Sequence, residues 1–332
     1  MTLQLFDSSS ASSRPDAVRI LGGFLLGNAP ADAAPAWPMQ SLVTPLLGTD
    51  RSGFEEAWVV PGDAPMQSGH AEGIAWRRCS DLLFGVIELD ETQVTAAPPR
   101  SALHVASEMA YARIFRLLDA QGLPHLWRLW NYMADINGES DGLERYRQFN
   151  MGRAEAFEHA ARSVVGRVPA ACALGLAGGP LSIAFLASAT PVIPIENPRQ
   201  VSAFLYPIDY GPRPPTFSRA ALAHPPGQEI LFVSGTASIV GHQTVHLGDV
   251  RAQTAESLDN IVAVLAAARP HSRSGGFALP DLAYRVYVRD AADLAVVREV
   301  IDSRLGAAPV LCVLADVCRS DLLVEIEAQG IR

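Results

Sequence analysis

The feature that most constrains the fold of this chain is an internal repeat after residue 100. In the first copy, an apolar stripe with helical spacing over Ala102–Leu123 precedes a strand-like run at Leu126–Met133 and a second helix over Leu143–Arg162. The second copy has the same order: a helix over Asp249–Arg269, a strand at Leu282–Val288 and a helix over Leu294–Leu305. The pattern predicts two halves that share one fold. Chance similarity between two α/β segments is the alternative.

The ends of the two copies also correspond. The run that begins at Pro169 and contains Cys172 parallels the run that contains Cys312, and after a one-residue gap Ala184 aligns with Glu325. Each half then consists of a β-rich start, a helix, a strand, a second helix and a closing strand. This order predicts an α+β protein, in which helices pack on one face of each mixed sheet.

The Pro-rich segment Pro194–Pro198 is the predicted domain boundary, so we expect domains at residues 1–195 and 196–332. A single large core is the other option for a chain of 332 residues. Before residue 100 the pattern is weak and predicts no particular architecture.

Charge and composition exclude several functions. The net charge of −9 argues against nucleic acid as a main partner, because binding to phosphates needs a basic surface. All 26 basic residues are Arg, and the absence of Lys excludes Schiff-base catalysis, a pyridoxal-phosphate lysine and a Walker A loop. The four Cys have neither the number nor the spacing of a disulfide framework or a zinc site. We therefore expect no cofactor.

One segment is long enough to cross a membrane. Val168–Ile195 has no charged residue over 28 positions, but its Pro and Gly residues favour two buried strands joined by a turn. The N-terminus has no basic start followed by an apolar run, which is the pattern of a signal peptide. We expect a cytoplasmic protein without a membrane span.

Two Tyr/Arg pairs are the strongest candidates for a binding site. Tyr146 and Arg153 are seven residues apart, which places them two turns apart on one face of a helix. Tyr206 and Arg219 form the second pair, thirteen residues apart. Guanidinium groups bind carboxylates in a bidentate manner and a phenol adds a neutral donor, so the pairs suit a small dianion. Packing together with surface ion pairs is the alternative for both.

Glu325 is the candidate proton donor. It lies between Val324 and Ile326, and an apolar strand would raise the pKa of its carboxyl group by desolvation. The alternative is that Glu325 faces solvent on an edge strand. His242 and His246 are four residues apart and could share a strand face, but no third ligand is evident, so we expect no metal site.

The second half resembles the Rid/YjgF family over about residues 229–329. The resemblance lies in ILFVSGTAS, GDVRAQTAESLDNIVAVLAAA, YRVYVRD and VCRSDLLVEIEA. It implies a chorismate mutase-like fold, and with the repeat it predicts two tandem Rid/YjgF-like halves.

Over roughly residues 100–330 the chain also resembles the chorismatases, through LWRLWNYMADIN, GLERYRQFNMGR, VSAFLYPIDYGPRPPTFSRA and LFVSGTASIVGH. The resemblance implies that chorismate is the substrate. The two Tyr/Arg pairs fall on the family's substrate-contacting positions, and Glu325 falls on its catalytic glutamate. Cys318, seven residues earlier, is similar to the cysteine of the branch that makes 3-hydroxybenzoate, and the branch that also makes 4-hydroxybenzoate stays open.

A Rid-like imine deaminase and a non-catalytic ligand-binding Rid-type protein are the alternatives for function. We expect pyruvate as the second product, no partner other than the small substrate, and a site that a monomer can complete.

Overall fold

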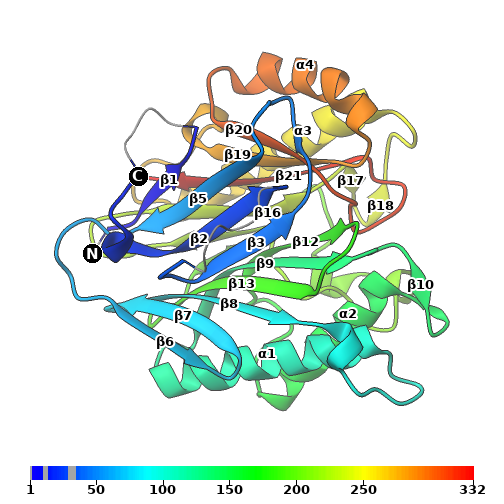
Figure 1. The fold of residues 1–332 in the computed structure, drawn as a ribbon. Coiled ribbons are helices and arrows are strands. Elements are labelled where there is room, and N and C mark those ends of the chain that lie inside the picture. Colours follow the sequence, from blue (N-terminus) through cyan, green and yellow to red (C-terminus); the bar gives the residue numbers. More distant parts are fainter. Residues whose placement is uncertain (1, 10–13, 29–34) are drawn as a thin grey trace.

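In a computed structural model, which describes residues 2–9, 14–28 and 35–332, two large mixed sheets lie between two layers of helices. Helices α3 and α4 cover the outer face of one sheet, and helices α1 and α2 cover the outer face of the other (Figure 1). The predicted α+β class, with helices on one face of each sheet, is confirmed.

The first large sheet has six strands in the order β12-β9-β13-β8-β7-β6. The elements of this half are β6 (Gln67–Ala71), β7 (Ile74–Cys79), β8 (Leu82–Leu89), α1 (Ala102–Gln121), β9 (His125–Ala134), α2 (Arg145–His159), β12 (Ala170–Leu176) and β13 (Leu181–Ser188). Only β9 and β12 pair in parallel.

The second large sheet repeats this topology. Its elements are β14 (Ile193–Ile195), β15 (Ala220–Ala223), β16 (Ile230–Thr236), α3 (Val250–Ala268), β19 (Ala283–Val288), α4 (Leu294–Leu305), β20 (Val310–Leu314) and β21 (Val324–Ile331). The order β20-β19-β21-β16-β15-β14 matches the first half strand for strand, and again only one pair, β19 with β20, is parallel. The predicted internal repeat is therefore confirmed.

Strand register corrects one detail of the predicted repeat. Cys172 faces the core between the sheets, whereas Cys312 faces the helices of its own half. The two cysteines are not equivalent, because successive side chains of a strand point to opposite faces. Val313 faces the core like Cys172, and twelve residues separate Cys172 from Ala184 as well as Val313 from Glu325. The match of Ala184 with Glu325 then needs no gap.

Local sequence determines where the helices begin. Helix α1 begins after Ser101, whose side chain accepts a hydrogen bond from the N–H of His104, and it ends at Gly122 in the left-handed conformation (φ 67°). Helix α3 begins after Asp249, which accepts from the N–H of Ala252. Two short hairpins precede α2 and α3: β10 (Glu139–Ser140) with β11 (Leu143–Glu144), and β17 (Ile239–Val240) with β18 (Gln243–Thr244).

The N-terminal region, for which the sequence predicted no architecture, forms a third sheet. Its strands are β1 (Gln4–Asp7), β2 (Ile20–Gly27), β3 (Met39–Val43) and β5 (Gly53–Val59), in the order β1-β5-β2-β3. The short strand β4 (Leu46–Leu47) leaves this sheet and pairs with β20 at the edge of the second large sheet.

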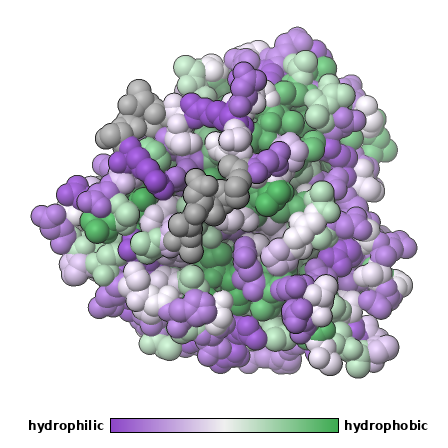
Figure 2. All heavy atoms as spheres, viewed as in Figure 1, coloured by the Kyte–Doolittle hydropathy of each residue, from purple (hydrophilic) through white to green (hydrophobic). Residues whose placement is uncertain are grey.

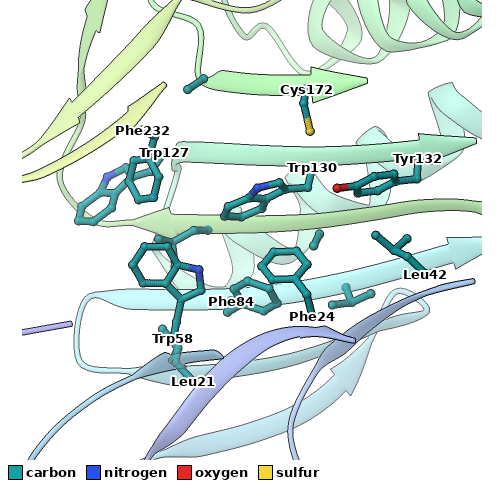
Figure 3. Close-up of a cluster of buried hydrophobic side chains, with 14 of the residues drawn as sticks. Leu21, Phe24, Leu42, Trp58, Phe84, Trp127, Trp130, Tyr132, Cys172 and Phe232 are labelled. Atoms are coloured by element: carbon teal, nitrogen blue, oxygen red, sulfur yellow. The ribbon is translucent and has the colours of Figure 1, made fainter. Parts of the chain in front are cut away.

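One apolar core joins the three sheets (Figure 3). Phe24 and Trp58 from the N-terminal sheet meet Phe84 and Trp130 from the first large sheet and Phe232 from the second. Separate apolar clusters lie between each large sheet and its helices. Hydrophilic residues cover most of the face shown in Figure 2, with apolar residues visible between them.

The uncharged segment Val168–Ile195 contains β12, β13 and β14, which confirms the prediction of buried strands. Among the described residues, no helix has both the length and the apolar character that a membrane span requires.

Candidate active site

A cavity of about 550 Å³ lies between the two halves, and both halves supply its walls. All six residues singled out in the sequence line it: Tyr146, Arg153, Tyr206, Arg219, Cys318 and Glu325. The volume is in the range of pockets that enclose one small ligand. Residues as far apart as Tyr146 and Glu325, 179 positions, are thus brought together, because the equivalent sheets of the repeat face each other.

Helix α2 supplies Tyr146 and Arg153 to one wall, as the seven-residue spacing predicted. Arg153 is 1% exposed, and its Nη2 donates to Oδ1 of Asn150 at 2.6 Å. Its guanidinium lies 4.9 Å from the ring centroid of Phe149, and its Nε has no partner within the described chain. A buried cation with a free donor is suited to a carboxylate ligand. Burial raises the pKa of Tyr146, so its hydroxyl is a neutral donor.

The second Tyr/Arg pair forms a direct contact. Nη2 of Arg219 donates to the hydroxyl of Tyr206 at 2.8 Å and to the carbonyl of Val201 at 2.8 Å. Arg219 immediately precedes β15, and its Nε is buried without a partner among the described residues. The segment between Tyr206 and β15 lines the cavity with Tyr210, Pro215 and Phe217, which accounts for the wide spacing of the pair.

Glu325 lies on β21, which pairs with β16 on one side and β19 on the other. The alternative of an edge strand facing solvent is therefore wrong, because β21 is central and Glu325 is only 4% exposed, as expected for an acid on an apolar strand. Burial, followed by the negative charge of Glu327, raises the pKa of Glu325 to about 8, against the opposing effects of Arg128 and Arg219. The carboxyl group is thus mostly protonated at neutral pH.

Gly235 on β16 provides the space for this carboxyl group. A Cβ atom at Gly235 would lie 1.9 Å from Oε1 of Glu325 and 2.7 Å from its Cδ. The ladder between β16 and β21 shifts register between Val233 and Thr236, so a β-bulge brings Gly235 against the acid. The sequence contained this glycine within the SGTAS run, but only the bulge shows its purpose.

Cys318 lies in the loop before β21 and lines the same cavity. Burial, followed by the charge of Glu325, raises the pKa of its thiol to about 12. Cys318 is therefore a neutral thiol and not a thiolate nucleophile.

Tyr210 and Arg319 are lining residues that the sequence reasoning did not select. The guanidinium of Arg319 lies 4.0 Å from the ring centroid of Tyr210 and 5.2 Å from that of Tyr206. Its Nη1 donates to the carbonyl of His242 at 2.9 Å. Arg319 thereby holds the Tyr206 segment against the β17–β18 hairpin, and its position next to Cys318 was one indication in the sequence.

The prediction that His242 and His246 share a strand face is wrong. Strand β18 is Gln243–Thr244, and His246 has a left-handed backbone (φ 60°). Nδ1 of His242 is 3.2 Å from the hydroxyl of Tyr210, and no group of three or more potential metal ligands occurs in the described part of the chain.

Comparisons with known proteins agree with this geometry. A sequence model for "Chorismatase FkbO/Hyg5-like, N-terminal" matches residues 56–187. The chain is 44% identical over 283 residues to a chorismatase of Streptomyces rapamycinicus, covering 82% of this chain and 81% of that protein. It is 39% identical over 285 residues to a 3-hydroxybenzoate synthase of Streptomyces hygroscopicus, covering 82% and 80%. A crystal structure of a chorismatase superposes with a TM-score of 0.85 at 36% identity, covering 99% of this chain and 98% of that one.

Proposed function

Because the chain belongs to the chorismatase family, we propose that it converts chorismate to 3-hydroxybenzoate and pyruvate. The protein is a chorismate-cleaving enzyme, and its aromatic product and the roles of its residues are the proposal. One observation supports these roles most: the cavity combines two buried Arg residues with a carboxylic acid whose pKa is raised to about 8.

Two cationic anchors suit the two carboxylates of chorismate. Arg153 and Arg219 each have a buried Nε that no other described residue contacts by a hydrogen bond, and Tyr146 and Tyr206 add neutral donors. Each charge-assisted hydrogen bond contributes about 1.5–3 kcal/mol. The anchors hold the enolpyruvyl group and the ring in fixed positions relative to Glu325.

Glu325 starts the reaction as a general acid. It transfers its proton to the methylene carbon of the enolpyruvyl ether, which produces an oxocarbenium ion and a Glu325 carboxylate. An attack that involves the ring, followed by loss of pyruvate and of a ring proton, gives the phenol. The Glu325 carboxylate takes a proton back, so chorismate is divided into hydroxybenzoate and pyruvate without net uptake of water.

Cys318 determines how the cation collapses. Its neutral thiol lies in the same cavity as Glu325 and favours attack from the ring over attack by water, which would give a diol. We keep 4-hydroxybenzoate open as a further product. A Rid-like imine deaminase, the alternative from the sequence, is not favoured by relatives that match over four fifths of the chain.

Incubation of the purified protein with chorismate tests the proposal. We expect pyruvate in a coupled dehydrogenase assay and 3-hydroxybenzoate by chromatography, with Glu325→Gln as the matched inactive variant. Formation of a non-aromatic diol in place of 3-hydroxybenzoate would contradict the proposed branch. Release of no more pyruvate than by the Glu325→Gln variant would contradict the function itself.

We also propose that the enzyme acts as a cytoplasmic monomer without a cofactor. Both halves of one chain line the cavity, so a second subunit is not needed to complete it. Light scattering after gel filtration tests the oligomeric state, and cell fractionation tests the location.

A further inference from the structure

Glu327 is a buried carboxylate close to the cavity but absent from its lining. It follows Glu325 by two positions on β21, so both side chains project from the same face of the strand. The residues between and beside them, Val324, Ile326 and Ala328, pack against the helices on the other face. Glu327 is 5% exposed.

Two Arg side chains and a Tyr hydroxyl, from both halves of the molecule, hold the Glu327 carboxylate, and the Cys172 thiol on β12 also donates a hydrogen bond to it. Arg128, on β9 of the first half, forms an ion pair with its Oε2 and is itself 2% exposed. From β19, Nη1 of Arg285 lies 3.2 Å from Oε1, and the hydroxyl of Tyr287 donates to Oε1 at 3.0 Å. A buried carboxylate stays ionised only with partners of this kind.

The Glu325 carboxyl has a different environment. It makes no hydrogen bond within the described chain, so its protonation depends on burial and on charges acting through space. The titratable and charged groups that face it are Glu327 on its own strand, Tyr287 on β19, Cys172 on β12, Arg128 on β9, Arg219 before β15, Tyr146 on α2 and Cys318 in the preceding loop. Glu144, Asp209 and Asp321 also line the cavity, but among the described residues Glu327 is the only other carboxyl on the strand face of Glu325.

We infer that Glu327 is a positioning residue for the cleavage: its ionised carboxylate, held by Arg128 and Arg285, keeps Glu325 protonated without contacting the substrate. The inference rests on the proposed role of Glu325 as the acid. A negative charge on the same strand face favours the neutral form of its neighbour, and it does so more strongly in a dry interior than in water. The direction of the pKa shift of Glu325 agrees, since burial and then Glu327 raise it while Arg128 lowers it.

A structural role for the Arg128–Glu327 pair, as a link between the halves, is the alternative. The two roles predict different effects when each partner is removed. Loss of a structural link destabilises the protein in the same way whichever partner is removed. Loss of charge moves the protonation of Glu325 in opposite directions for the two partners.

The test compares Glu327→Gln, Arg128→Met and the double variant by the pH dependence of kcat with chorismate. The upper pH limit of activity should fall by about one unit in Glu327→Gln, given like charges roughly 7 Å apart. It should rise in Arg128→Met. In the double variant the upper pH limit should lie between the limits of the two single variants and below that of the wild type. The reason is that Glu327 acts more strongly on Glu325 than Arg128 does. KM should change less than about twofold in all three, since neither side chain lines the cavity.

Two control variants separate charge from general damage. Glu327→Asp keeps the charge and should leave the limit close to that of the wild type. Glu229→Gln removes another buried carboxylate, one that accepts from Ser272 and Ser274. It adjoins Ile230, whose partner on β21 is Ile331, about 20 Å along the strand from Glu325. Glu229→Gln should lower stability without moving the limit.

The inference would be overturned if the upper pH limit moved in the same direction in Glu327→Gln and Arg128→Met, or if it moved in neither. If a single variant does not fold, the double variant decides, because removal of both charges preserves neutrality; an unchanged or raised limit there also overturns it. Infrared titration of the Glu325 carboxyl, assigned by its loss in Glu325→Gln, reads the same shifts without turnover. A wild-type protein that released no pyruvate would refute the proposed function, while this titration would still decide the role of Glu327.

Discussion

Glu325 is the residue on which the proposed reaction depends, because a general acid must carry a proton when the substrate arrives. Glu325→Gln keeps the shape of the side chain but removes the transferable proton. We expect kcat to fall on the order of 10²-fold or more, with KM nearly unchanged. In the wild type, kcat should fall as pH rises through about 8, where the acid form is lost. Steady-state kinetics from pH 6 to pH 10, about two units on each side, measures both.

The same pKa shift has a consequence for stability that serves as a control. Between the ordinary value of 4.5 and about 8, the folded protein keeps a proton that the unfolded chain releases. The free energy of unfolding of the wild type should therefore fall as pH rises through this window. Glu325→Gln should lack that loss, and urea denaturation at both ends of the window measures the difference. Equal pH dependence in the two proteins would contradict the raised pKa.

Cys318 and the two anchoring Arg residues should differ in what they change. Cys318→Ala should alter the ratio of aromatic products with only a mild loss of rate, because its neutral thiol is proposed to direct the collapse of the cation. Arg153→Ala and Arg219→Ala should act mainly on KM, since they hold carboxylates that are present before and during the reaction. Chromatography of products and steady-state kinetics separate these effects. An unchanged product ratio in Cys318→Ala would leave that thiol a packing role only.

At the scale of elements, the bulge on β16 positions the acid on β21. Gly235→Ala would place a methyl group 1.9 Å from Oε1 of Glu325, so the carboxyl or the strand must move. A displacement of about 1 Å in a catalytic group costs on the order of 10²-fold in rate, and we expect kcat to fall by that order. Gly178→Ala, in the turn between β12 and β13, is the control, because a Cβ there meets nothing within 4 Å. Similar kinetics for both variants would show that the space at Gly235 is not needed.

At the scale of the whole molecule, the N-terminal sheet joins the two halves. The ring centroids of Phe24 and of Trp130 from the first half are 4.9 Å apart. The guanidinium of Arg285 from the second half lies 4.8 Å from the Phe24 ring centroid. Phe24→Ala should lower the free energy of unfolding by about 3–5 kcal/mol. Val43→Ala, at a 74% exposed position on β3, should change it by less than about 0.5 kcal/mol. Urea denaturation measures both, and a small effect of Phe24→Ala would mean that the halves are stable without this sheet.

Sequence alone determined the helices, the central strands and the repeat, because these depend on local periodicity. The predicted helix over Leu294–Leu305 coincides with α4, and the strand at Leu282–Val288 differs from β19 by one residue. Periodicity also placed Tyr146 and Arg153 on one helix face. The six candidate residues came from motif resemblance and residue chemistry, and all six line one cavity.

Only the tertiary structure decided the rest, because it depends on contacts between distant segments. Two facing sheets bury Glu325 and bring Glu327 and Arg128 together from positions 199 residues apart. A bulge places Gly235 against the carboxyl group of Glu325, and strand register makes Val313, not Cys312, the counterpart of Cys172. The N-terminal sheet had no clear periodicity, since β2 is buried on both faces and includes the buried glycines Gly22 and Gly23. The pKa of a carboxyl group is likewise set by what surrounds it in space, which a linear pattern does not specify.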